Sequence, residues 1–200
     1  MPKYLIFFAV IMLVFYGIEE YKESGKNELQ IDMSRETLYN LLESAKDDIS
    51  KNYFDMTLKQ IEKAIDYLKK VEQSLDPATN SVIDQAILDM QKVEQDIRNR
   101  VIYEKDLNMA FAKAMNALAL AHLRVCEDEL EAGREEEALA SLKATINHLQ
   151  HSMKYSSGEL LETEVQLVEE LANLSSSGDI TVSTIHKDVE KIRSIVLMKD

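Results

Sequence analysis

Four side chains that could coordinate a metal ion or a haem iron lie in the middle of the chain. His122 and Cys126 stand four residues apart, and His148 and His151 stand three apart. On a helix, each spacing places both side chains on one face. In a helical hairpin that turns at Gly133, the levels of His122 and His148 differ by about 6 Å, which leaves a shared metal site open. The simpler interpretation is boundary histidines and, at Cys126, a small buried apolar side chain.

Several other kinds of functional site are excluded because their sequence motifs are missing. The sequence has no Gly-rich phosphate loop, no Cys-x-x-Cys-His and no His-Glu-x-x-His. Helical di-iron proteins use Glu-x-x-His pairs, but the residues three before the four histidines are Ala119, Thr145, His148 and Ser183. No nucleophile paired with a base is recognisable, so we expect neither an enzyme nor a bound cofactor. The single cysteine excludes an intramolecular disulfide.

Seven acidic residues gather around Gly133, and we name them the acidic tip. The last three would occupy the first turn of a helix, where the helix dipole favours negative charge. The other four would stand at a helix end, where the dipole disfavours them, so helix stability does not explain them. We interpret the tip as a site for a divalent cation or a basic partner, against the plainer view of a solvated charged turn. It comprises Glu127, Asp128, Glu129, Glu131, Glu135, Glu136 and Glu137.

The element that must position these groups is a helical hairpin between Ala110 and Met153. Apolar residues recur at steps of three and four on both sides of Gly133, which predicts two helices with one apolar stripe each. Glycine readily adopts the left-handed backbone that ends a helix, so the turn is expected there. The stripes are Phe111, Ala114, Met115, Leu118, Ala121, Val125 and Leu130, followed by Ala138, Leu139, Leu142, Ile146, Leu149 and Met153.

Periodicity predicts five further helices and no strand. Five glycines and two prolines in 200 residues suit long helices joined by short turns. The fold class is therefore all-α, an antiparallel helical bundle over residues 34–200, with Ser34 as its first cap. The predicted helices cover about 38–49, 58–75, 83–97, 161–171 and 182–196, with breaks at 52–55, 76–77, 155–158 and 175–179.

The chain partly repeats itself at an offset of 81 residues, so that the hairpin of 38–75 falls opposite that of 115–153. Asn52 then falls opposite Gly133, and both residues can turn a chain. Leu41 opposite His122 is a mismatch, and any two amphipathic hairpins align in part, so duplication and chance both stay open. The matched pairs are Leu38 with Ala119, Leu42 with Leu123, Ala45 with Cys126, Ile49 with Leu130, Leu58 with Leu139, Ile61 with Leu142, Ile65 with Ile146 and Leu68 with Leu149.

Two family resemblances follow from these hairpins. The hairpin 118–149, with EEEALASLKATI after its glycine, resembles one tetratricopeptide-type hairpin, in which Ala138 and Thr145 are the small residues around Leu142. The aromatic and proline signatures of that family are missing. The two-hairpin layout behind an apolar N-terminus also resembles the YfdX family of bacterial periplasmic helical proteins. That resemblance implies a helical, non-enzymatic, stress-associated protein and carries over no site residues.

The N-terminus predicts export. Residues 4–18 form an unbroken apolar run after Lys3. Such a run spans about 22 Å as a helix, short of the ~30 Å hydrocarbon core, so it suits a signal peptide or an uncleaved signal anchor within 1–18. Phe15 two residues before Gly17 makes a poor cleavage site, which favours the anchor. The polar segment 19–33 is a predicted linker, and Lys3 places the bundle outside the cytoplasm.

The net charge indicates which classes of partner the protein can bind. The net charge of −13 disfavours the binding of nucleic acid, because its phosphates are also negative. The leading expectation is an exported or membrane-anchored protein, periplasmic or secreted if cleaved, that binds another protein without catalysis. We expect membrane contact through residues 4–18, and a homo-oligomer also fits. The alternatives are a metal- or haem-binding bundle and an extracytoplasmic sensor module.

Overall fold

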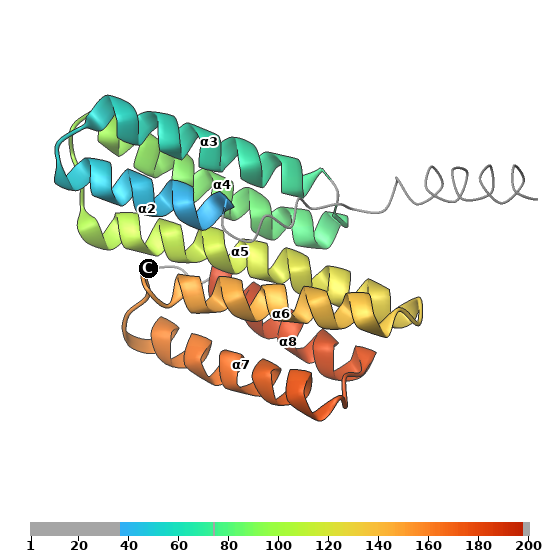
Figure 1. Ribbon diagram of the computed structural model, residues 1–200. Helices are drawn as coiled ribbons and strands as arrows, with labels where there is room; N and C mark the ends of the chain where they lie inside the picture. Colours follow the sequence, from blue (N-terminus) through green and yellow to red (C-terminus); the bar gives the residue numbers. More distant parts are fainter. Residues whose placement is uncertain (1–36, 74, 198–200) are drawn as a thin grey trace, which may run out of the picture. The chain divides into compact units, whose positions relative to one another are not determined.

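The computed structural model describes residues 37–73 and 75–197, all within one compact unit that spans Ser34–Asp200. As the sequence predicts, this described part is all-α, with seven helices and no strand. Successive helices run in alternating directions (Figure 1). They are α2 (Thr37–Ser50), α3 (Phe54–Glu72), α4 (Pro77–Arg98), α5 (Glu104–Glu131), α6 (Glu135–Ser152), α7 (Gly158–Ser177) and α8 (Val182–Val196).

The predicted signal segment 1–18, the linker 19–33 and the cap at Ser34 lie outside the described residues. Among the helices that are described, none is long and apolar enough to cross a bilayer. The signal-peptide and signal-anchor interpretations therefore stay predictions.

Helix α5 is the axis of the unit. It packs against α4, α6 and α8, and it also touches α2 and α3. Every residue from Ala110 to Leu123 is buried, and many of these are alanines, whose small side chains let several neighbours pack closely. The single apolar stripe predicted for this helix is therefore wrong, because between Ala110 and Leu123 neighbours cover all of its faces. Val125 and Leu130, which belong to the predicted stripe, are only half-buried.

Three turns between helices share one hydrogen-bonded geometry. Each has a residue with left-handed backbone: Asn52 (φ 61°), Arg100 (φ 57°) and Gly133 (φ 73°). The Gly133 amide bonds to the Leu130 carbonyl at 3.1 Å, and the next amide reaches five residues back at 2.8 Å. These paired bonds define a Schellman turn, and they recur at the other two residues. The predicted turns at Gly133 and Asn52 are confirmed, whereas Arg100 is unexpected because its Cβ disfavours this backbone.

The two hairpins that align in sequence also bury their matched positions alike. Leu42 and Leu123 are both fully buried, as are Ala45 and Cys126. Among the eight matched pairs, only Ile65 and its counterpart differ in burial, since Ile146 is half-exposed. This agreement fits two hairpins of one design, α2 with α3 and α5 with α6. The duplication itself stays a prediction.

The serine-rich segment 175–179 was predicted as a loop, and this prediction is partly wrong. Helix α7 continues because the Ser176 hydroxyl donates to the Asn173 carbonyl at 3.0 Å, and Ser177 makes the equivalent bond at 3.3 Å. The Leu174 carbonyl also accepts the Gly178 amide at 3.3 Å, so side chains and backbone together hold the last turn. Gly178, with a φ of 75°, then ends the helix.

Candidate functional site

An open groove of about 700 Å³ lies between the last turns of α5 and the first turns of α8. Three residues of the acidic tip line it from α5, namely Glu127, Asp128 and Glu131. His186 and Lys187 face them from α8. Arg124, Val182 and Ser183 complete the lining. Carboxylates beside a short apolar surface suit a lysine or arginine side chain, whose stem is apolar and whose end is charged.

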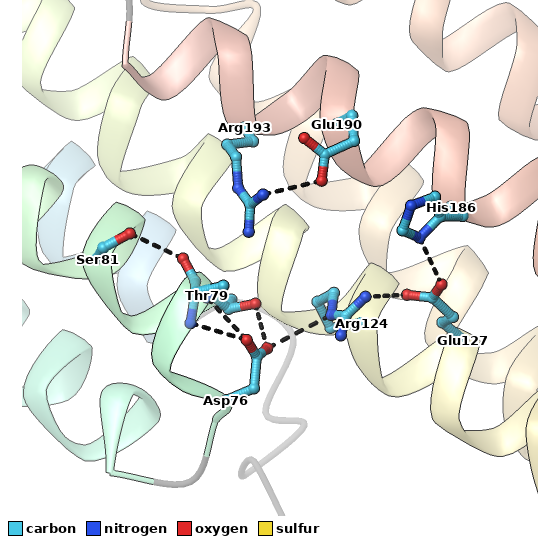
Figure 2. Close-up of polar contacts among 9 residues, drawn as sticks. Asp76, Thr79, Ser81, Arg124, Glu127, His186, Glu190 and Arg193 are labelled. Carbon is cyan, nitrogen blue, oxygen red and sulfur yellow. Dashed lines mark hydrogen bonds and ion pairs between the residues drawn. The ribbon is translucent and has the colours of Figure 1, made fainter.

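A chain of polar contacts links three helices beside this groove (Figure 2). Glu127 is buried, and its Oε1 lies 2.9 Å from Nδ1 of His186 on α8. Its other carboxylate oxygen pairs with Arg124, one turn earlier on α5. Arg124 also reaches Oδ2 of Asp76, which lies 3.4 Å from its Nε at the start of α4. Arg124 therefore divides its positive charge between two carboxylates.

Asp76 caps α4 and is fixed by that role. Its Oδ1 accepts hydrogen bonds from the amides of Ala78 at 2.9 Å and Thr79 at 3.1 Å. Burial raises the pKa of Asp76, but the bonds from Thr79 and Ala78 and the charge of Arg124 together hold it below its usual value. Asp76 is thus negative at neutral pH, and it competes with the acidic tip for Arg124.

The carboxylates on the groove carry more negative charge than their neighbours neutralise. Burial raises the pKa of Asp128, and the charges of Glu131, Glu127 and Asp76 raise it further, against the opposing effect of Arg124. A carboxyl whose pKa is raised by other carboxylates is stabilised when a cation approaches. The electrostatics of the groove therefore favour a positively charged ligand.

The rest of the acidic tip lies outside the groove lining. Glu129 pairs with Arg134 across the Gly133 turn. The remaining three, Glu135 to Glu137, are exposed in the first turn of α6, where the helix dipole favours them. In the described part of the chain, no group of three or more His, Cys, Asp or Glu side chains is placed to hold a metal ion.

The residues predicted to bind a metal or haem are brought only partly together. The rings of His122 and His148 are stacked with centroids 5.0 Å apart, and both are buried. His151 instead stacks on Tyr39 of α2, at 3.9 Å. Cys126 is fully buried, and burial, with a further contribution from two glutamates, raises its pKa to about 12, so its thiol is not reactive at neutral pH.

His148 is held in its neutral form. Burial, followed by repulsion from His122 and His151, lowers the pKa of His148 to about 3. Its Nδ1 accepts no hydrogen bond from any described residue. The neutral ring therefore packs as part of the core between α5 and α6.

A second buried polar centre was missed at the level of sequence. Glu164 of α7 is fully buried, and one of its carboxyl oxygens accepts hydrogen bonds from Asn116 at 2.6 Å and Ser152 at 2.7 Å. Burial raises the pKa of Glu164, although these bonds oppose the shift. The signal was available, since Glu164 occupies the apolar stripe of its helix between Leu160 and Leu167.

Comparison with known proteins gives no relative: no protein-family model, no curated protein and no solved structure matches this chain. The resemblances to tetratricopeptide-type hairpins and to the YfdX family therefore stay predictions. The function is inferred from the side chains of this protein alone.

Proposed function

We propose that this protein is an exported or membrane-tethered helical protein that binds a basic segment of another protein in the groove between α5 and α8. One observation carries the proposal. Glu127, Asp128 and Glu131 converge on an open groove whose lining contains only two basic side chains, Arg124 and Lys187, and Arg124 is shared with Asp76. A lysine or arginine of the partner would relieve this repulsion. The net charge of −13 would also attract a basic partner from a distance.

The spacing of the carboxylates defines the partner further. Asp128 and Glu131 are three residues apart and thus neighbours on one face of α5. A partner helix with two basic side chains one turn apart matches this pair. Val182 on the opposite wall can contact their aliphatic stems.

The experiment is a fluorescence titration of the full chain with a labelled lysine-rich helical peptide. Replacing both groove carboxylates, Asp128→Asn with Glu131→Gln, removes two charge pairs. At about 0.7 kcal/mol for each pair, we expect roughly tenfold weaker binding. The fold should persist, because a carboxyl whose pKa is raised destabilises the folded state at neutral pH.

The matched control removes the same charge elsewhere. Glu159 and Glu162 are exposed at the start of α7 and lie outside the groove lining. Glu159→Gln with Glu162→Gln should change the affinity by no more than about twofold, through screened long-range charge alone. Equal weakening by both double variants would show that net charge, and not the groove, attracts the peptide.

A further inference from the structure

One end of the unit exposes large apolar side chains on two neighbouring loops. The α2–α3 loop and the α4–α5 loop lie at the same end (Figure 1). Tyr53 in the α2–α3 loop is 57% exposed, and Met56 in the first turn of α3 is 47% exposed. In the α4–α5 loop, Val101 is 45% and Tyr103 63% exposed. A hollow of about 330 Å³ between the loops is lined by Tyr53, Phe54, Met56 and Arg100, among others. We call Tyr53, Phe54, Met56, Arg100, Val101 and Tyr103 the apolar pole.

The apolar pole is electrically balanced in an acidic protein. Over 51–57 and 99–106 the basic residues are Lys51, Arg100 and Lys105, and an equal number of acidic residues accompanies them. The chain as a whole carries −13. The acidic tip is at the far end of α5, 28 residues away, which corresponds to about 42 Å of helix. The pole therefore does not share the field that attracts basic ligands to the tip.

The pole also departs from local backbone preferences. Its α4–α5 turn has Arg100 at a φ of 57°, where Gly133 serves at the equivalent turn of α5. The Arg100 guanidinium lies over the Phe54 ring, 5.7 Å from its centroid. Both tyrosines, Tyr53 and Tyr103, stand at N-cap positions and make no capping bond through their side chains. Glycine would suit the left-handed backbone of Arg100 better, and serine or aspartate would cap the two helices better than tyrosine. The chain instead has exposed aromatic and basic side chains at these positions.

We propose that the apolar pole lies in the headgroup region of a lipid bilayer. Tyrosine is enriched at this depth because its ring is apolar and its hydroxyl remains hydrated. Arginine and lysine place their stems beside apolar groups while their charges stay in water. An electrically balanced surface that exposes tyrosines and an arginine fits this environment, whereas the acidic tip would be repelled by anionic lipids and would point away.

The chain that precedes the bundle permits this contact. Helix α2 has 14 residues and spans about 21 Å, so its first residue is about that far from the pole. Residues 19–36 can extend to about 60 Å, so an apolar segment at 4–18 in the same bilayer would not prevent the pole from reaching it. The inference rests on the membrane tether of the proposed function and is independent of the groove.

The experiment places one tryptophan reporter in the full chain, which has no native tryptophan. Tyr103→Trp reports on the pole, and Leu88→Trp is the control because Leu88 is 57% exposed on α4 and outside the pole. Each variant is reconstituted with phosphatidylcholine vesicles that carry bromine-labelled acyl chains. We expect Tyr103→Trp to shift its emission to the blue and to be quenched severalfold more than Leu88→Trp.

Three results would overturn the lipid contact. The first is vesicle-bound protein whose two reporters are quenched equally, which would mean that only the N-terminus touches lipid. The second is failure of the full chain to float with vesicles, with peptide binding in the groove intact. The third is a concentration-dependent blue shift of Tyr103→Trp without vesicles, which would assign the pole to a second copy of the chain. Tyr53→Ser should lower the quenching of the Tyr103→Trp reporter without lowering the melting temperature, because Tyr53 is exposed.

Discussion

The two sides of α5 differ in what they bury. On the side covered by α2, α3 and α4, most of the described buried side chains are apolar, and the buried charge of Lys113 pairs with Asp89 at 3.3 Å. On the side covered by α6, α7 and α8, the core contains Asn116, Glu164 and a stacked pair of histidines. The same axial helix thus has a largely apolar side and a polar side.

This difference separates stability from its pH dependence. Apolar burial contributes free energy that does not change with protonation. A buried histidine or carboxyl whose pKa is shifted makes the free energy of unfolding depend on pH. We therefore expect substitutions on the apolar side to act equally at all pH values, and substitutions on the polar side to act in defined pH ranges.

The largest effect is expected from Leu68→Ala on the apolar side. Leu68 is fully buried in α3, and its truncation should lower the free energy of unfolding by about 3 kcal/mol through lost burial and a cavity. The loss should be the same at pH 5 and pH 7.5, because leucine does not titrate. Urea unfolding at both values measures it, with exposed Leu88→Ala as the control. A loss that changes with pH would contradict the separation of the two sides.

His148→Leu should have the next largest effect, and only in acid. The folded pKa of His148 is about 3, against 6.5 for an ordinary histidine. Between these two pKa values the unfolded chain binds a proton at His148 that the folded chain does not. The free energy of unfolding is therefore highest above pH 6.5 and decreases as the pH falls below it. The slope reaches about 1.4 kcal/mol per pH unit, so His148→Leu should be the more stable form by about 2 kcal/mol at pH 5.

The comparison of the same two proteins at neutral pH is the control for this variant. At pH 7.5 His148 is neutral in both states, and the two proteins should differ by no more than about 1 kcal/mol. An unchanged slope between pH 7 and pH 5 would mean that His148 takes up its proton in the folded protein.

Glu164→Gln should also stabilise the protein, by a smaller amount and with the opposite pH dependence. The folded pKa of Glu164 is raised, so its favourable contribution is present below the unfolded value of 4.5 and is lost as pH rises through the folded value. Glutamine keeps an acceptor for Asn116 and Ser152 but does not ionise. At pH 7 the variant should be more stable by on the order of 1 kcal/mol, and near pH 4 the gain should vanish. A variant that is less stable at pH 7 would contradict the raised pKa of this buried carboxyl.

The helices and most turns could be predicted because they depend on local chemistry. Apolar periodicity located all seven described helices, and Gly133 and Gly158 both have the left-handed backbone expected where the chain breaks. The single stripe on α5 failed because periodicity reports one covered face, whereas the number of neighbours is a property of the whole fold. Arg100 could not be predicted as a left-handed residue, since arginine carries no preference for it.

Only part of the candidate site could be predicted from the sequence. The acidic tip was recognised from charges that the helix dipole does not favour, and three of its residues line the groove. His186 and Asp76 could not be assigned to it, because they come from helices far away in the chain. The proximity of His122 and His148 could be predicted from hairpin geometry, but the burial that lowers the pKa of His148 could not.

The most direct test of the proposed function is to locate the bound peptide by methyl NMR of the full chain. With the lysine-rich peptide at saturation, we expect the Val182 methyl resonances in the groove to shift, while those of Leu88 on α4 and Val101 on the apolar pole remain in place. Shifts at Val101 or Leu88 with none at Val182 would contradict the binding of a basic partner between α5 and α8.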